Sequence, residues 1–293
     1  MTDKSENEKI IQKRRAIQKI EFLPSIPVML QRIIAISNDP HSSAQDLQET
    51  IIKDQSISAA VLKLANSAYY GYPRSVGDIS RAVVIIGFKT VVSVAICVSV
   101  FKSLSDKFTS REFSTEEFWK HTIAAGEAAK ILAQNIKYEF SSLAYIIGLL
   151  HDIGKIALSF SNPSQFDDAV FDSRALDKPL HSCEEQIFGF DHQTAGGWLG
   201  ERWQLPESIL AGIKYHHNIE ACPENLQDEA IIAHTANYLA KSAKFGNSGD
   251  ERLRKLHPFV ETKLNITSGT LEKVKSELEK KREEINMFLE SIE

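Results

Sequence analysis

Apolar residues recur at helical spacing along most of the chain, and no segment shows the strict apolar and polar alternation of a strand. In the segment that follows Ile26, Leu30, Ile33 and Ile34 fall on one helical face. Pro40 ends this helix, because proline disfavours a helical conformation in the residue before it. We therefore predict an all-α protein of helices joined by short loops.

Helix-start signals and charge divide the chain of 293 residues into four parts. Ser43 with Asp46 and Ser114 with Glu117 form capping-box patterns, and Pro206 suits the first turn of a helix. The predicted parts are a charged flexible lead-in over 1–19, an N-terminal helical unit over 20–110, a second helical unit over 111–245, and a loop with an amphipathic C-terminal helix over 246–293. Within the second unit, we predict helices over 141–160, 177–189, 192–203, 206–217 and 228–243.

The charge of the chain argues against a nucleic-acid partner. The formal net charge is −5, and no cluster of lysine and arginine stands out on a predicted helix face. Nucleic-acid-binding proteins normally carry a basic stripe or patch. We expect no binding to DNA or RNA.

The sequence also bears on the compartment. Cys97, Cys183 and Cys222 are widely spaced and form no CxxC pair, so neither a disulfide framework nor a thiolate zinc site is expected. The charged N-terminus lacks the apolar core of a signal peptide. The most apolar stretch, VVSVAICVSVF, is much shorter than the roughly 20 residues of a membrane-spanning helix. We expect a cytoplasmic protein with no membrane partner.

The peptide GLLHDIGK places a histidine and an aspartate inside an apolar run, where an unpartnered carboxylate would be costly. Five histidines and one aspartate fall at predicted helix positions that face the core: His121, His151, Asp152, His192, His216 and His217. Asn237 and His234, three positions apart, share a face of the next helix.

Two interpretations of these residues stay open. One histidine on an apolar face is more often a hydrogen-bonded core or capping residue than a metal ligand. The whole set offers imidazole nitrogen and carboxylate oxygen, the ligands of zinc, iron, nickel or manganese. On spacing alone, a shared divalent-metal site and separate structural roles have equal weight. His41, His181 and His257 fall in predicted polar loops, and we assign them no function.

Several peptides follow one another in a characteristic order: LPSIPVMLQRIIAISNDP, IIKDQSISAAVLKLANSAYYG, ISRAVVIIGFKTVVSVAI and FGFDHQTAGGWLGERWQLPESILAGIKYHH. Together they resemble the HDOD domain, the HD-related output domain of bacterial signalling proteins. His121 followed by HDIGK is similar to the wider HD superfamily of metal-dependent phosphohydrolases. The resemblance covers roughly residues 20–245. It implies an all-α HD-superfamily fold with an N-terminal helical subdomain and an HD-like metal-binding unit over 111–245.

The resemblance extends to particular site residues. By position, His121, His151, Asp152, His192, His216 and His217 match the ligand set of the HD-GYP group, which hydrolyses cyclic di-GMP at a two- or three-metal centre. Lys155 matches the lysine that contacts substrate phosphate in that group. The analogy makes iron the first choice of metal, in a centre of one or two ions, with zinc, nickel and manganese as alternatives.

Two departures from the HD-GYP pattern weaken the case for catalysis. Asn237 stands where the last metal-binding aspartate of HD enzymes is expected, so it is a seventh candidate ligand, but a neutral amide is a poorer ligand than a carboxylate. No Gly-Tyr-Pro follows the histidine pair. HDOD domains are typically regarded as non-catalytic regulatory modules.

Two functions from different classes follow. The first is a signalling module that acts through contacts with other signalling proteins, with a metal that is structural or ligand-sensing and little or no catalysis. The alternative is a metal-dependent phosphohydrolase, in which Lys155 would neutralise phosphate charge; otherwise Lys155 is a surface-facing helix residue. A nucleotide or phosphate ligand and a homodimer through the C-terminal helix stay open in both.

Overall fold

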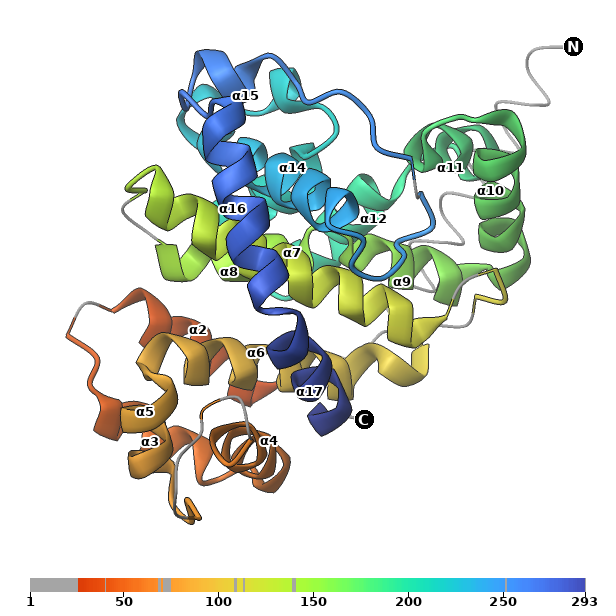
Figure 1. Ribbon diagram of the computed structural model, residues 1–293. Coiled ribbons are helices and arrows are strands. Elements are labelled where there is room, and N and C mark those ends of the chain that lie inside the picture. The colour runs from red at the N-terminus through yellow and green to blue at the C-terminus, as the bar shows by residue number, and fades with distance from the viewer. Residues whose placement is uncertain are drawn as a thin grey trace, which may run out of the picture.

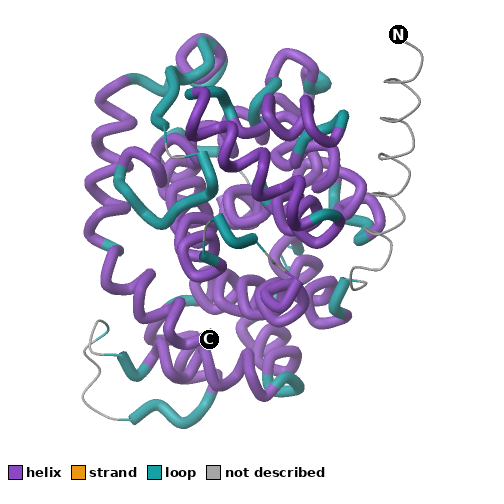
Figure 2. Tube along the Cα trace, turned by 90° about the vertical axis from the view of Figure 1, so that its right-hand side faces the viewer, coloured by secondary structure: helices purple, strands orange, loops and turns teal. Residues whose placement is uncertain are grey.

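The computed structural model describes residues 26–39, 41–67, 70, 75–107, 110–112, 114–138, 141–250 and 252–292. Within these ranges every regular element is a helix (Figures 1 and 2), which confirms the all-α prediction. The predicted lead-in over residues 1–19 lies outside the described residues. The boundaries of the other three predicted parts stay predictions.

The first helices of the chain pack together at one end of the molecule (Figure 1). Asp46 and the N-cap Ser43 form the predicted capping box, and Gly87, at φ 86°, makes the turn between two of these helices. The last helix of the group is buried on nearly all sides. The helices are α2 (Val28–Asn38), α3 (Ala44–Ile51), α4 (Gln55–Ala65), α5 (Ile79–Ile86) and α6 (Phe88–Leu104).

The second group of helices surrounds α7, which packs on α8 and α14. Ser114 caps α7 by accepting a hydrogen bond from the backbone N–H of Glu117. The helices are α7 (Thr115–Asn135), α8 (Ser141–Leu150), α9 (Ile153–Ser161), α10 (Pro163–Leu176), α11 (Leu180–Phe188), α12 (His192–Arg202), α13 (Glu207–Tyr215) and α14 (Gln227–Ser242), with the short 3-10 turns η2 (Ile219–Ala221) and η3 (Glu224–Leu226) before α14.

The helices of this region differ from the predicted helices at three points. The single helix predicted over 141–160 is broken into α8 and α9, because apolar residues continue through the break and hide it from periodicity. Helix α10, which Asn162 caps and Pro163 begins, was not expected. The helix predicted over 177–189 begins only at Leu180, since Asp177 ends α10 in a left-handed conformation with φ 56°.

The C-terminal segment carries α15 (Phe259–Thr262), α16 (Ser268–Lys280) and α17 (Arg282–Ile292), so the single amphipathic helix expected here is two helices that break at Lys281. Figure 1 shows α16 crossing the second group of helices and α17 lying against the first. Lys63 of α4 donates to the carbonyl oxygen of Glu290 at 2.7 Å. The C-terminal helices therefore tie the two groups together.

Among the described residues, two helical segments are long and apolar enough to cross a membrane by length and composition alone, Phe88–Lys107 and Leu143–Ser161. Both are mostly buried within the protein, as the core helices of a soluble domain are. Residues 91–101, the most apolar stretch, belong to the first of them, and all of these residues except Phe101 are buried in the core.

Candidate metal centre

His151 and Asp152 occupy the turn between α8 and α9, and both are fully buried. Asp152 has φ −99° and ψ 10°, outside the helical region, and its carbonyl oxygen accepts a hydrogen bond from the backbone N–H of Lys155 at 2.9 Å. The interruption of the helix places the Asp152 carboxylate among side chains from several other helices.

Two glycines let the neighbouring helices approach this turn. A Cβ atom on Gly154 would lie 1.8 Å from the carbonyl oxygen of His192, at the start of α12. A Cβ atom on Gly148 would lie 2.4 Å from the carbonyl oxygen of Ala125 in α7. Because neither position has room for a side chain, the turn lies directly against α7 and α12, which carry His121 and His192.

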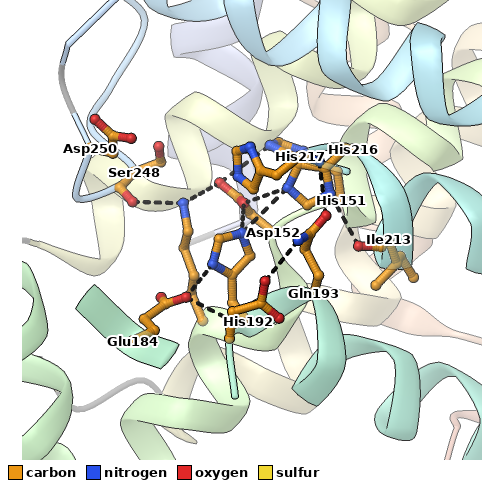
Figure 3. A network of polar contacts seen from close by, with 12 residues as sticks. His151, Asp152, Glu184, His192, Gln193, Ile213, His216, His217, Ser248 and Asp250 are labelled. Atoms are coloured by element: carbon orange, nitrogen blue, oxygen red, sulfur yellow. Dashed lines mark hydrogen bonds and ion pairs between the residues drawn. The ribbon is translucent and has the colours of Figure 1, made fainter. Parts of the chain in front are cut away.

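Two clusters of candidate ligands share the Asp152 carboxylate, and Figure 3 shows the one that contains His192, His216 and His217. On one side, Oδ1 lies 3.3 Å from Nε2 of His192 and 3.6 Å from Nε2 of His216, and His217 completes this cluster. On the other side, Oδ2 lies 3.2 Å from Nε2 of His151 and 4.0 Å from Nε2 of His121. Within each cluster the candidate ligand atoms lie within 4.8 Å of one another.

Hydrogen bonds at Nδ1 orient three of the imidazole rings. His151 donates from Nδ1 to the carbonyl oxygen of Gly148 at 2.7 Å, and His216 donates to that of Gly212 at 3.0 Å. His192 donates from Nδ1 to Oε2 of Glu184 at 2.5 Å. Each ring therefore carries a proton on Nδ1 and directs Nε2 at Asp152, the orientation typical of metal-binding histidines.

Orphaned polar atoms fit the same interpretation. Both ring nitrogens of His121, Nε2 of His151 and Oδ1 of Asp152 are buried and have no hydrogen-bond partner among the described residues. Burial lowers the pKa of His121, His192 and His217 well below the ordinary value of histidine, so these rings are neutral and free to bind a cation. The donor set fits a divalent transition metal.

Lys155 is buried, so the alternative of a surface-facing residue is wrong. Its Nζ lies 2.6 Å from Oδ2 of Asp152 and donates to the carbonyl oxygen of Ser248 at 2.9 Å. Burial acts to raise the pKa of Asp152, but His151 and Lys155 overcome this effect and hold the pKa well below its ordinary value. Asp152 is therefore an ionised ligand candidate that already contacts one cation.

Glu184 is the site residue that sequence reasoning missed. Its Oε2 accepts hydrogen bonds from the backbone N–H of His192 at 2.9 Å and from Nδ1 of the same ring. The side chain is fully buried, and burial raises its pKa to about 8. A signal was present, because Leu180, Glu184 and Phe188 are four residues apart and share the buried face of α11.

Asn237 lies in the wall of a cavity beside His217, with its Oδ1 buried and unpartnered among the described residues. Its predicted role as a metal ligand stays a prediction. His234, which shares the helix, instead supports a neighbour: its Nδ1 donates to the carbonyl oxygen of His216 at 2.8 Å. Its Nε2 accepts from the backbone N–H of His257 at 3.1 Å.

Two of the histidines assigned to polar loops lie at this cavity. His181 belongs to α11, not to a loop, and stacks on His217 with ring centroids 4.5 Å apart. His257 lies in the segment between α14 and α15 and also lines the cavity. His41, in contrast, is exposed and belongs to the N-terminal group of helices, between α2 and α3. The sequence could not show the first two contacts, because they join distant segments.

Comparison with known proteins extends these findings. The chain is 26% identical over 259 residues to an uncharacterized protein of Treponema pallidum (strain Nichols), covering 87% of this chain and 50% of that protein. The chain thus spans about half the length of this curated relative.

Solved structures share the fold over almost the entire chain. An HDOD domain protein of unknown function from Geobacter sulfurreducens matches with a TM-score of 0.80 and 24% identity, over 98% of this chain and 99% of that one. A Marinobacter aquaeolei VT8 protein assigned provisionally to signal transduction matches with a TM-score of 0.80 and 21% identity, over 97% and 65%. A Shewanella amazonensis SB2B protein assigned provisionally as a phosphohydrolase matches with a TM-score of 0.71 and 22% identity, over 95% and 98%.

At these identities the structural matches show the fold alone. The family model of the HDOD domain matches residues 23–219, which is more than half of the chain. This match confirms the resemblance seen in the N-terminal peptides and in the segment around His192. The chain belongs to the HDOD domain family.

Proposed function

We propose that this protein is a regulatory HDOD module of a bacterial signalling pathway whose His/Asp cluster binds a divalent metal, with little or no catalysis. The observation that carries the proposal is the shared orientation of His151, His192 and His216, whose Nε2 atoms all lie within 3.6 Å of one buried carboxylate. Since Asp152 offers one oxygen to each cluster, it would be a ligand common to both, and the arrangement suits one or two ions. Iron is our first choice, with zinc, nickel and manganese as alternatives.

The site supports metal binding better than it supports turnover. A bound divalent ion would lower the pKa of a water molecule and polarise a phosphoryl oxygen. Asn237, where HD enzymes are expected to carry an aspartate, adds no negative charge. The ammonium group of Lys155 donates hydrogen bonds to Asp152 and to the carbonyl oxygen of Ser248. Because both bonds are to the protein, this group is less available to a substrate phosphate.

One observation favours the alternative, a metal-dependent phosphohydrolase acting on cyclic di-GMP or another nucleotide. A cavity adjoins His217 and is lined by several cationic side chains, so a phosphate group could reach the edge of the centre. In that case, Lys155 would turn from Ser248 to the substrate and neutralise developing charge on the phosphate.

The test has two parts. Elemental analysis of protein purified without added metal should find a bound transition metal, and hydrolysis assays on cyclic di-GMP and nucleotides should find no turnover above background. Turnover that His151→Ala and Asp152→Ala abolish would replace the regulatory proposal with the phosphohydrolase. Folded protein that takes up no metal, even from added iron, zinc or manganese, would refute both.

We further propose a cytoplasmic location and action through contacts with signalling proteins. The relative from Treponema pallidum is about twice as long as the aligned region, so in that protein this region is joined to further sequence. The mostly buried apolar helices agree with a soluble module. Sedimentation of the purified chain would test the proposed homodimer, and co-purification with signalling proteins from a bacterial host would test the partners.

A further inference from the structure

A cavity of about 220 Å³ lies beside the metal centre. His217, His234 and Asn237 form part of its wall. Another part comes from the strap, which consists of the described residues 246–250 and 252–257 between α14 and α15. Figure 3 shows Ser248 and Asp250 of the strap on one side of the Asp152 cluster. Every strap residue lies beyond residue 219, where the family match ends.

Hydrogen bonds attach the strap to the centre at both ends. Near its start, the carbonyl oxygen of Ser248 accepts from Lys155, and the backbone N–H of Asn247 donates to the carbonyl oxygen of Glu117 at 3.1 Å. Near its end, the backbone N–H of His257 donates to His234, which also contacts His216. The strap is therefore held in place at the cavity by hydrogen bonds to α7, α9 and α14.

The charged side chains that line the cavity are mainly cationic. Among the described lining residues, Asp250 is the one carboxylate, and Lys241, Arg252, Arg254 and Lys255 are the four cations. Asp177, at the end of α10, pairs with Arg252 and lies 3.9 Å from Arg254, so it neutralises part of this charge from outside the cavity. The remaining excess of positive charge favours an anion.

Asp250 occupies the position of a counter-ion without making close bonds to its partners. Its carboxylate is mostly buried, 3.8 Å from Nζ of Lys241 and 3.9 Å from Nε of Arg254. Neither distance is within hydrogen-bonding range. An anion with more oxygens could satisfy both cations better than this carboxylate does.

Two uncharged polar atoms in the cavity wall indicate that the ligand also donates hydrogen bonds. Oδ1 of Asn237 and Nδ1 of His181 are buried and have no hydrogen-bond partner among the described residues. Asn237 is only 5% exposed. Both atoms can accept hydrogen bonds, so they suit a ligand that carries hydroxyl donors in addition to its charge.

We propose that this cavity is a receptor site for a phosphomonoester that also carries hydroxyl groups, and that Asp250 is the internal counter-ion displaced by the phosphate. Lys241, Arg254 and Lys255 bind the phosphate, and Asn237 accepts from a hydroxyl group. The volume lies below the roughly 300–1,000 Å³ of pockets for drug-sized ligands, so it suits a sugar phosphate better than a cyclic dinucleotide. The inference rests on the proposed function only in treating this molecule as a signal and not as a substrate.

Calorimetric titration of the full chain tests the site, with ribose 5-phosphate, adenosine monophosphate and inorganic phosphate as probes and ribose as the uncharged control. Ribose 5-phosphate should bind more tightly than inorganic phosphate, and ribose should not bind. Lys241→Gln and the exposed Lys255→Gln should each weaken binding about tenfold or more, because each removes a charged partner. Asp250→Asn should strengthen it, whereas Lys273→Gln on the exposed face of α16 should change nothing.

Binding of adenosine monophosphate as well would identify the source as a nucleotide, and binding of ribose 5-phosphate alone would identify a sugar phosphate; both support the receptor site. Absence of binding by either phosphomonoester overturns it. Binding that chelation abolishes and that Lys241→Gln and Lys255→Gln leave unchanged also overturns it, since the anion would then be a metal ligand. Folded protein that takes up no added iron, zinc or manganese but binds ribose 5-phosphate would refute the proposed metal centre and leave the receptor site standing.

Discussion

The ammonium group of Lys155 lies 2.6 Å from Oδ2 of Asp152, and both side chains are buried. The same carboxylate lies 3.2 Å from the ring of His151 through Oδ2 and 3.3 Å from that of His192 through Oδ1. Lys155 thus supplies a fixed positive charge to the one carboxylate that both ligand clusters share. A metal that binds there would share the Asp152 carboxylate with Lys155.

Lys155→Met should therefore destabilise the metal-free protein more than the metal-bound protein. Leaving a buried carboxylate without its partner costs about 3–5 kcal/mol, and a bound metal would restore a cation beside Asp152. Urea unfolding of chelated and metal-loaded protein measures the difference. Lys273→Met, on the exposed face of α16, is the control. An equal loss of stability in both states would show that metal and lysine do not share the carboxylate.

Glu184→Gln should weaken metal binding by about 10–100-fold while the fold is kept, because a carboxylate that orients a ligating histidine contributes about this much to affinity. Competition with a chelating dye measures the affinity. The adjacent Glu185 is exposed on the same helix, so Glu185→Gln is a matched control. If both variants bound metal equally well, His192 would not depend on Glu184 for its orientation.

Gly154→Ala should disrupt the centre through the backbone. The added Cβ would lie 1.8 Å from the carbonyl oxygen of His192 and 2.5 Å from the backbone N of Gly196, so α9 and α12 must separate. We expect the free energy of unfolding to fall by about 1–3 kcal/mol or more, with loss of metal. Gly77 has no neighbour within 4 Å of its added Cβ, and Gly77→Ala should leave stability and metal content nearly unchanged. Retention of metal by Gly154→Ala would contradict this account of the packing.

The affinity for ribose 5-phosphate should fall as the pH rises. Burial lowers the pKa of Lys241 from 10.5 to about 8, opposed by Asp250 and Asp152 and assisted by Lys155 and Arg254. Lys241 is charged below this pKa and neutral above it, whereas the phosphate, with a second pKa of about 6, stays a dianion. Binding should weaken from about pH 7 to about pH 9, and Lys241→Gln should flatten the profile. An equally steep profile in the variant would exclude Lys241 as the titrating group.

The sequence predicts features that depend on residues close together in the chain, but not contacts between segments far apart in the chain. Helical spacing predicted the all-α fold, and the resemblance predicted six residues that the structure brings together around Asp152. The break at His151 and Asp152 was hidden, because Leu150 and Ile153 on either side are equally apolar. The burial of Glu184 could have been predicted, because Glu184 lies four residues from both Leu180 and Phe188 on the same face of α11.

The strap could not be predicted in the same way. Lys155 meets Ser248 across 93 residues of the chain, and nothing in the local pattern of either segment records this contact. The partners of His181 and His257 depend likewise on how α11, α13 and α14 pack. Local propensity predicts elements, whereas such contacts follow from tertiary packing.

The central claim is that the Asp152 cluster binds a divalent metal, and elemental analysis of the purified chain tests it most directly. The account predicts one or two transition-metal ions per chain in the wild-type protein. It predicts their loss in Asp152→Ala, with Glu185→Gln retaining them. Wild-type protein that is folded, has been exposed to iron, zinc and manganese, and still contains no metal would contradict it.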